Sequence, residues 1–317
     1  MWRPHSESFD GTEMREHSTL MSPLTEVRRL LHCNYNCRDV DNLERFYVEV
    51  FGLRAVMRSE SSGSDGSPFG VFGETASKAS FVYDHRGGRR SSSLELVQWI
   101  APATTGSVYP HAWNRGIQSA AYSAPDLDLI ATSAVSHGAT VIRQSADWLL
   151  LRDPEGVAVE VLRAEGPSEA KYLRVVCSDL ERSSEWWNRL GFVEAQLAAV
   201  PGTDIWPSDD SYRIIAERGL VGTDDPTFGI LLTTWAGPTP IAPTYGMPYH
   251  QGIYRIAMAV DDIEATFAAL DRAGVARQRP YTFQLPGTKL TDGLTMMFIR
   301  DPDGILIELV ERPRQPQ

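Results

Sequence analysis

Apolar and polar residues follow the same order at four places along the chain. Each place begins with a short apolar run, passes through an Asp into an amphipathic stretch, and ends near a Gly. An Asp side chain can accept hydrogen bonds from the free N–H groups at a helix start, and Gly adopts the backbone conformation that often ends a helix. The pattern therefore predicts a strand followed by a capped helix, four times. The four capping residues would be Asp39, Asp126, Asp179 and Asp262.

The four segments form two pairs that align without gaps. LLHCNYNCRDVDNLERFYVEVFGLRAV, which starts at Leu30, aligns with AKYLRVVCSDLERSSEWWNRLGFVEAQ, which starts at Ala170. GIQSAAYSAPDLDLIATSAVSHGATV, which starts at Gly116, aligns with GIYRIAMAVDDIEATFAALDRAGVAR, which starts at Gly252. Self-similarity of this kind indicates repeated structural units.

Strand-like runs follow each predicted helix, and in two units the last run begins at a DPxG sequence. These sequences are Asp153–Gly156 and Asp301–Gly304. Pro fits the second position of a tight turn and Gly supplies a positive φ, so each sequence predicts a hairpin. We therefore expect four units, each built as one strand, one helix and three further strands (βαβββ).

Local polarity suggests how the units are grouped. Residues 1–25 are polar, have no apolar period and are expected to form a disordered tail. The segment Arg163–Lys171 is polar and contains Gly and Pro, which is typical of a linker. It would separate an N-terminal domain of residues 26–163 from a C-terminal domain of residues 170–313, with two units in each.

Composition narrows the class of partner. The 317 residues include 30 Lys and Arg against 41 Asp and Glu, a formal net charge of −11, so we expect no nucleic-acid partner. No apolar run approaches the roughly 18 residues of a membrane helix, so no membrane partner is expected. With three Cys and no apolar signal segment, the default location is the reducing cytoplasm. We expect a small-molecule partner and a monomer or homodimer.

Four βαβββ units, with a DPxG hairpin before an IEL-type strand such as LIELV at Leu306–Val310, resemble the vicinal oxygen chelate superfamily. That group includes glyoxalase I, methylmalonyl-CoA epimerase, extradiol dioxygenases and metal-free antibiotic-sequestering proteins. The resemblance covers about residues 30–313 and implies an α+β fold of two glyoxalase-like, cup-shaped (half-barrel) domains. In the superfamily, two units form a cup, and its metal ligands come from the first and last strands of each unit.

The resemblance assigns these ligand positions to residues that differ in their ability to bind a metal. In chain order the position pairs are His32 and Glu95, Ser119 and Glu160, Tyr172 and Leu231, and Arg255 and Glu308. One imidazole and three carboxylates therefore survive. Such groups suit one divalent ion, which would be Fe²⁺, Mn²⁺, Zn²⁺, Ni²⁺ or Co²⁺, and the ion would chelate two adjacent substrate oxygens.

Two pairings of the units remain open. If the first unit faces the fourth, His32, Glu95 and Glu308 form the metal site, and Arg255 can bind a substrate carboxylate or phenolate. If each half closes on itself, Glu160 replaces Glu308. We prefer the first pairing because of Arg255, and expect one metal site at most. A spare carboxylate, Glu308 or Glu160, would be the general base. Each of these Glu residues could instead have a structural role, such as an ion pair with Arg255.

Strand alternation adds substrate contacts to this list. Residues two apart share a face of a strand, so Asn34 and Asn36 should point the same way as His32, while Cys33 and Cys37 point towards the helix. By the same rule Trp99 shares the face of Glu95 and would suit a planar or apolar substrate. The predicted substrate-binding residues are Arg255, Asn34, Asn36, Trp99, Tyr172 and Ser119.

Three functions fit these residues. The leading hypothesis is a metal-dependent lyase, isomerase or epimerase that acts on a small oxygenated, possibly aromatic metabolite. The first alternative is an Fe²⁺ ring-cleaving dioxygenase. The second is a metal-free protein that sequesters an aromatic compound with Trp99 and Trp235.

Overall fold

The computed structural model of the chain describes residues 24, 27–88, 90–207, 211–237, 246–276, 278–284 and 293–312. Apart from Leu24, the predicted tail of residues 1–25 lies outside the described residues. Leu24 itself is buried in the core, and its N–H donates to the carbonyl of Arg189. No helix in these ranges combines the length and the hydropathy needed to cross a membrane.

The structure contains the four predicted βαβββ units. The first consists of β1 (Leu30–Cys37), α1 (Val40–Phe51), β2 (Arg54–Asp65), β3 (Glu74–Tyr83) and β4 (Ser93–Ala101), with a short 3₁₀ turn, η1 (Ser67–Phe69), between β2 and β3. The second consists of β5 (Gly116–Ala124), α2 (Leu127–Ser136), β6 (Thr140–Gln144), β7 (Trp148–Arg152) and β8 (Ala158–Arg163). The third consists of β9 (Glu169–Val176), α3 (Leu180–Arg189), β10 (Phe192–Glu194), β11 (Arg213–Gly222) and β12 (Asp225–Ala236), with the single-turn helix α4 (Gly202–Ile205) before β11. The fourth consists of β13 (Gly252–Val260), α5 (Ile263–Arg272), β14 (Tyr281–Phe283), β15 (Leu294–Arg300) and β16 (Leu306–Glu311).

The predicted Asp residues begin all four of the longer helices. Each Asp has an extended backbone, and its side chain accepts hydrogen bonds from N–H groups in the first turn of the helix. These donors have no partner within the helix, so the caps compensate for a cost that every helix start carries. The caps at Asp39, Asp126, Asp179 and Asp262 are therefore confirmed as the local reason why the helices start where they do.

The strand order answers the question of pairing. One eight-stranded sheet runs β14-β15-β16-β13-β1-β4-β3-β2, and the other runs β10-β11-β12-β9-β5-β8-β7-β6. The first unit therefore joins the fourth, and the second joins the third, as preferred from the sequence. In the centre of each sheet two units meet through antiparallel strands, with Asn34 opposite Arg255 in one and Arg174 opposite Ser119 in the other.

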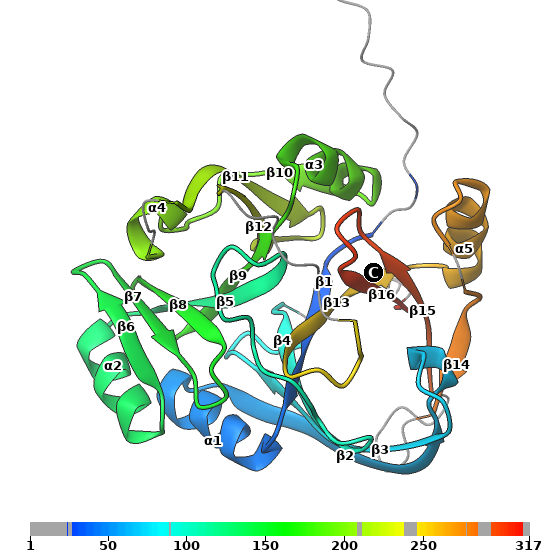
Figure 1. Cartoon of the computed structure of the whole chain (residues 1–317), viewed down its shortest axis with the longest axis horizontal. Helices are drawn as coiled ribbons and strands as arrows, with labels where there is room; N and C mark the ends of the chain where they lie inside the picture. Colours follow the sequence, from blue (N-terminus) through cyan, green and yellow to red (C-terminus); the bar gives the residue numbers. More distant parts are fainter. Residues whose placement is uncertain are drawn as a thin grey trace, which may run out of the picture.

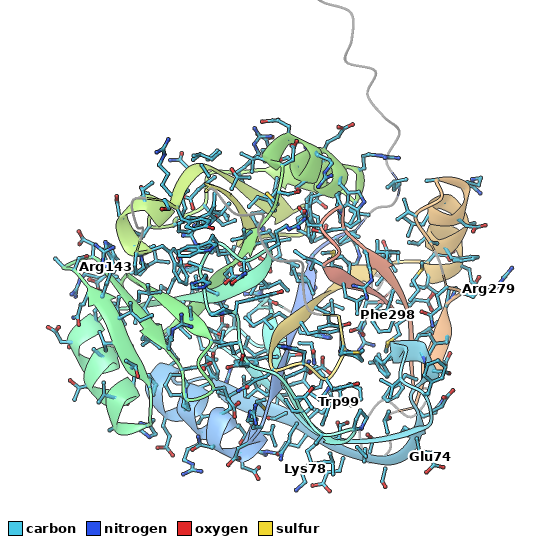
Figure 2. All side chains as sticks on the ribbon, in the orientation of Figure 1. Glu74, Lys78, Trp99, Arg143, Arg279 and Phe298 are labelled. Carbon is cyan, nitrogen blue, oxygen red and sulfur yellow. The ribbon has the colours of Figure 1, made fainter. Side chains whose placement is uncertain are left out.

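Both sheets are curved, and the longer helices cover their convex sides. In Figure 1 the long strands β2 and β3 bend round towards β14, so that the first sheet forms a half-barrel. Figure 2 shows Trp99 and Phe298 inside this curve, with Glu74 and Lys78 on its outer rim. Alternate residues of β1 follow the predicted parity, because Cys33 and Cys37 lie in the main hydrophobic core. The fold is thus the predicted α+β arrangement of four units in two cups.

The two DPxG hairpins hold the sheets together. Asp153, at the start of the β7–β8 hairpin, is buried and accepts hydrogen bonds from the hydroxyls of Tyr35 and Tyr47 in the other sheet's first unit. Asp303, in the β15–β16 hairpin of the first sheet, accepts hydrogen bonds from the backbone N–H and the hydroxyl of Ser178. Ser178 belongs to the third unit, in the second sheet. Each hairpin therefore supplies a buried carboxylate to the neighbouring unit.

We expect Tyr35→Phe to lower the free energy of unfolding by about 1–3 kcal/mol, because the buried carboxylate of Asp153 loses one of its donors. Urea unfolding followed by circular dichroism measures the change. Tyr122→Phe is the matched control, since Tyr122 is buried in the same core but its hydroxyl has no hydrogen bond to a described residue. Equal losses in the two variants would contradict the role given to the Tyr35 hydroxyl.

Candidate functional site

Four charged or polar side chains meet on the concave face of the first sheet because its four central strands lie side by side. β1 contributes His32, β4 contributes Glu95, β13 contributes Arg255 and β16 contributes Glu308. The strand register places Asn34 between Glu95 on one side and Arg255 on the other. Residues from the two ends of the chain thus converge, as the pairing of the first and fourth units predicts.

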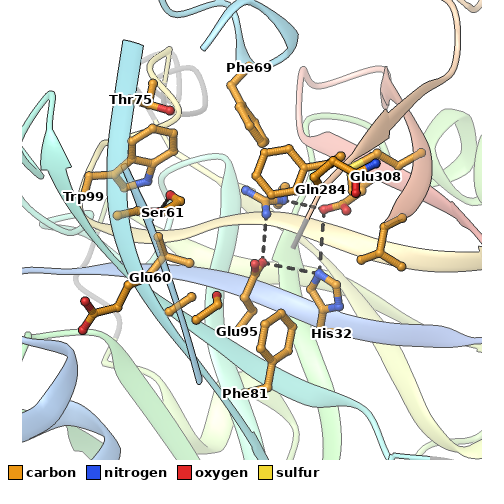
Figure 3. A pocket seen from close by; sticks show the side chains of 18 residues that line it. His32, Glu60, Ser61, Phe69, Thr75, Phe81, Glu95, Trp99, Gln284 and Glu308 are labelled. Carbon is orange, nitrogen blue, oxygen red and sulfur yellow. Dashed lines mark hydrogen bonds and ion pairs between the residues drawn. The ribbon is translucent and has the colours of Figure 1, made fainter. Parts of the chain in front are cut away.

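The four side chains form a closed ring in which nitrogen bases and carboxylates alternate (Figure 3). Arg255 donates from Nε to Glu308 Oε2 at 2.6 Å and from Nη2 to Glu95 Oε2 at 2.8 Å. His32 Nε2 lies 3.4 Å from Glu95 Oε2 and 3.7 Å from Glu308 Oε2. Asn34 adds a donor to Glu95 Oε2 at 3.3 Å. Both carboxylates are therefore held between the imidazole and the guanidinium.

Burial and charge determine the protonation of this ring. Burial alone lowers the pKa of His32, but Glu95 and Glu308 outweigh it and raise this pKa from 6.5 to about 9. Burial raises the pKa of Glu308, but Arg255 and His32 outweigh it and lower this pKa to about 2. With no metal bound, His32 is consequently a cation and Glu308 an anion at neutral pH.

The donor atoms of His32, Glu95 and Glu308 fit a divalent metal ion. All three lie within 4.8 Å of one another. His32 Nε2 is 3.4 and 3.7 Å from the two carboxylate oxygens, within the about 4.2 Å that can separate two ligands each about 2.1 Å from one ion. His32 Nε2 is buried and makes no hydrogen bond of normal geometry to a described residue, and its polar neighbours are the two carboxylates at ion-pair distance. One imidazole and two carboxylates suit the first-row divalent ions.

Arg255 occupies the remaining corner of the ring, where the superfamily resemblance places a fourth ligand. Its guanidinium binds the same two Oε2 atoms that face His32. A guanidinium cannot ligate a metal, because it stays protonated and has no acceptor. The ring therefore offers three protein ligands and leaves the other coordination positions open to a bound molecule.

A cavity opens directly above the ring. It encloses about 830 Å³ including its mouth. Apolar side chains line it together with hydroxyl groups of β2 and β3, and Ser77 of β3 pairs directly with Trp99 of β4. The apolar residues are Phe69, Trp99, Phe283, Leu294 and Met296, and the hydroxyl-bearing residues are Ser59, Ser61, Thr75 and Ser77.

Trp99 and Asn36, two of the predicted substrate-binding residues, are hydrogen-bonded to each other. Trp99 lines the cavity, and its Nε1 donates to Asn36 Oδ1 at 3.0 Å. Asn36 Nδ2 donates in turn to the carbonyls of Pro248 at 2.7 Å and His250 at 2.9 Å. Asn36 is therefore a positioning residue that fixes the indole rather than part of the cavity lining.

The other predicted residues lie in the second sheet, away from this ring. Glu160 is fully buried and receives hydrogen bonds from Ser119, Tyr172 at 2.7 Å, and Arg174 at 2.7 and 2.9 Å. Arg174 outweighs the effect of burial and lowers the pKa of Glu160. Trp206 donates to the same carboxylate at 3.1 Å. The structure thus does not bring Glu160, Ser119 or Tyr172 to His32, and it gives them a structural ion-pair network.

Two residues at these sites were not identified from the sequence. Arg174 lies two positions after Tyr172, and strand alternation, as applied to His32 and Asn34, could have placed it in the second cup. Phe69 comes from η1 and reaches over Arg255, whose guanidinium carbon is 5.8 Å from the ring centroid. A turn residue carries no periodic signal, so the sequence gives no indication of this contact.

Comparison with known proteins agrees with this architecture. The profile of the Glyoxalase/Bleomycin resistance protein/Dioxygenase superfamily matches residues 29–161 and 170–309. The chain belongs to this superfamily. Among solved structures, glyoxalase I from Zea mays has a TM-score of 0.62 at 19% identity and covers 90% of this chain and 92% of its own. A candidate dioxygenase from Bacillus subtilis has a TM-score of 0.56 at 13% identity and covers 92% of this chain and 87% of its own.

At such low identity, these likenesses concern the fold alone. A search of curated proteins gives no match. The superfamily hosts many reactions, so the function must be argued from the residues of the ring and the cavity.

The stability of the metal-free protein should fall as the pH rises from 6.5 through about 9. His32 has a higher pKa in the folded chain than in the unfolded chain, so its charged contacts stabilise the fold fully below 6.5 and are lost as it deprotonates. The loss is on the order of 3 kcal/mol at most. Urea unfolding in chelator across this pH range measures it. His32→Gln should show a flatter profile, and an unchanged slope in that variant would contradict the assignment.

Proposed function

We propose that this chain is a divalent-metal-dependent enzyme of the vicinal oxygen chelate type, with lyase, isomerase or epimerase chemistry on a small oxygenated metabolite. The observation that carries the proposal is the convergence of His32, Glu95 and Glu308 at the base of a cavity. The position of His32 Nε2 beside both carboxylates supports a metal-binding role, because two negative charges favour a cation at this buried nitrogen.

The ion would act as a Lewis acid towards adjacent substrate oxygens. The chain's own residues divide the remaining work. Glu308 is a poor proton acceptor, because the Arg255 guanidinium, which donates to it at 2.6 Å, keeps the pKa of this carboxylate low. Glu95 is the better general base, since Asn34, Arg255 and His32 all contact its Oε2, whereas its Oε1 has no hydrogen bond to a described residue. Glu160, buried in the other sheet, has no part in this step.

A metal-free binding protein is the second candidate function, and Arg255 favours it. The guanidinium already compensates both carboxylates, so the ring is electrically balanced without a metal once His32 is protonated. The apolar wall with Trp99 would then bind an aromatic compound without chemistry. The presence or absence of a bound metal separates the two functions.

Calorimetric titration with Zn²⁺, Mn²⁺, Ni²⁺, Co²⁺ and, without oxygen, Fe²⁺ should show one site per wild-type chain. His32→Ala and Glu308→Gln should each weaken binding by at least about 100-fold, because even partners of metal ligands typically contribute 10- to 100-fold.

Glu160→Gln is the matched control for Glu308→Gln, since both positions hold a buried Glu paired with an Arg on a central strand. It should keep the wild-type affinity. A wild-type protein that binds none of the five ions would refute the metalloenzyme and leave the binding protein. Equal losses in the two Gln variants would show that the effect is on folding rather than on ligation.

A further inference from the structure

The charge of the ring specifies the charge of the molecule that the cavity takes. We propose that this cavity selects small monoanions, with one carboxylate or phenolate at Arg255 and an apolar, ring-bearing body against Phe69 and Trp99. The proposal rests on the metal-dependent function proposed above and extends it to the class of substrate.

The ring would carry a net positive charge with a divalent ion bound. Glu95 and Glu308 carry two negative charges, whereas a divalent ion together with Arg255 carries three positive charges. A neutral His32, as metal ligation requires, adds none. One positive charge is therefore left over in a buried site, where an uncompensated charge is strongly unfavourable. A bound monoanion restores neutrality and a neutral molecule does not.

Arg255 keeps one donor nitrogen that no described residue uses. Its Nε and Nη2 are used by Glu308 and Glu95, whereas Nη1 has no hydrogen bond to any residue that the structure describes. Arg255 lines the cavity, and its guanidinium carbon lies 5.8 Å from the centroid of the Phe69 ring. A guanidinium N–H is a strong donor to an anionic oxygen. The excess charge and the available donor thus lie on the same side of the cavity.

The second sheet shows how an Arg with a purely structural role differs. Arg174 is only 1% exposed, and all its polar atoms have partners. Its Nη1 binds Glu217 and Thr233, while Nε and Nη2 bind Glu160. No donor is left over there, whereas the corresponding arginine of the first sheet keeps one. The difference makes Arg255 a binding group as well as an ion-pair partner.

The rest of the cavity limits the ligand to one negative charge. Among the described residues that line it, Arg255 is the only Lys or Arg. Glu60 also lines it, but its side chain is 75% exposed and pairs with Lys78 at 3.6 Å, so the lining offers no second cation to another anionic group. The hydroxyl groups of β2 and β3 and the apolar side chains of the same lining suit a ligand with a polar edge and an apolar ring.

Paired probes test this selectivity. Mandelate is a monoanion with adjacent oxygens and a phenyl ring, and mandelamide is its neutral counterpart. Both are titrated into metal-loaded protein, with binding measured by calorimetry and by tryptophan fluorescence. The metal itself favours a carboxylate, so the informative quantity is how a variant changes the ratio of the two affinities.

We expect Arg255→Met to reduce the preference for mandelate by about 10- to 100-fold, the range for a hydrogen bond to a charged group. Arg255→Lys, which keeps the charge, should retain most of the preference. If Arg255→Met does not fold, Arg255→Gln supplies the same neutral comparison while keeping a donor for Glu308. The metal affinity should rise in either neutral variant, because a positive charge beside the ion is removed.

The outcomes distinguish the two proposals. If the wild-type protein binds metal but the ratio is the same in wild type, Arg255→Met and Arg255→Gln, the selectivity for monoanions is wrong and the metal site stands. If the wild-type protein binds no metal, the proposed enzyme fails and this inference fails with it. The ratio of the mandelate affinity to the mandelamide affinity could also fall as far in Arg255→Lys as in Arg255→Met. This result would show that the ligand needs the planar guanidinium rather than its charge, and it would overturn the charge argument.

Discussion

A buried arginine requires a carboxylate, and this constraint shapes both cups of the molecule. Each sheet brings one Arg to the concave side of its central strands and pairs it with the Glu of a hairpin strand, Arg255 with Glu308 and Arg174 with Glu160. Neither ion could be left alone at such burial without a cost of several kcal/mol. The two arginines come from opposite strands of the central pair, since Arg255 faces Asn34 whereas Arg174 faces Ser119. The same electrostatic requirement has thus been met twice in different ways.

The difference between the cups follows from what covers each ion pair. In the second cup the chain between β10 and β11 places Trp206 on Glu160, and apolar neighbours such as Val200 and Ile205 complete a packed cluster. The ion pair is sealed and serves stability. In the first cup the corresponding space is the cavity, so Glu95 and Arg255 face a volume that a ligand can enter. One fold therefore yields a closed half with a structural ion pair and an open half with a cavity.

The sequence predicts the features that depend on neighbouring residues. It does not predict those that depend on contacts between distant parts of the chain. The Asp caps and the strand alternation that separates His32 from Cys33 depend on neighbouring residues, and the structure agrees with them. The pairing of units could only be preferred, because β1 can satisfy its backbone hydrogen bonds against more than one partner strand. Arg174 is not at a ligand position of the superfamily, and the third unit, with Tyr172 and Leu231 at those positions, gives no metal-site signal that points to it. Phe69 acts from an irregular turn, which has no period to detect.

A proton and the proposed metal ion compete for His32 Nε2, and Arg255 influences the balance between them. Two carboxylates beside the imidazole favour any cation at Nε2, which is why the pKa of His32 rises to about 9. The positive guanidinium of Arg255 disfavours both a proton and a metal ion at Nε2. It repels a divalent ion twice as strongly as a proton, because Coulomb repulsion scales with charge. Relative to a site with a neutral fourth residue, metal binding here is weakened and proton binding less so. A bound anion reverses that disadvantage by neutralising Arg255, so metal and substrate anion should favour each other's binding in this cavity.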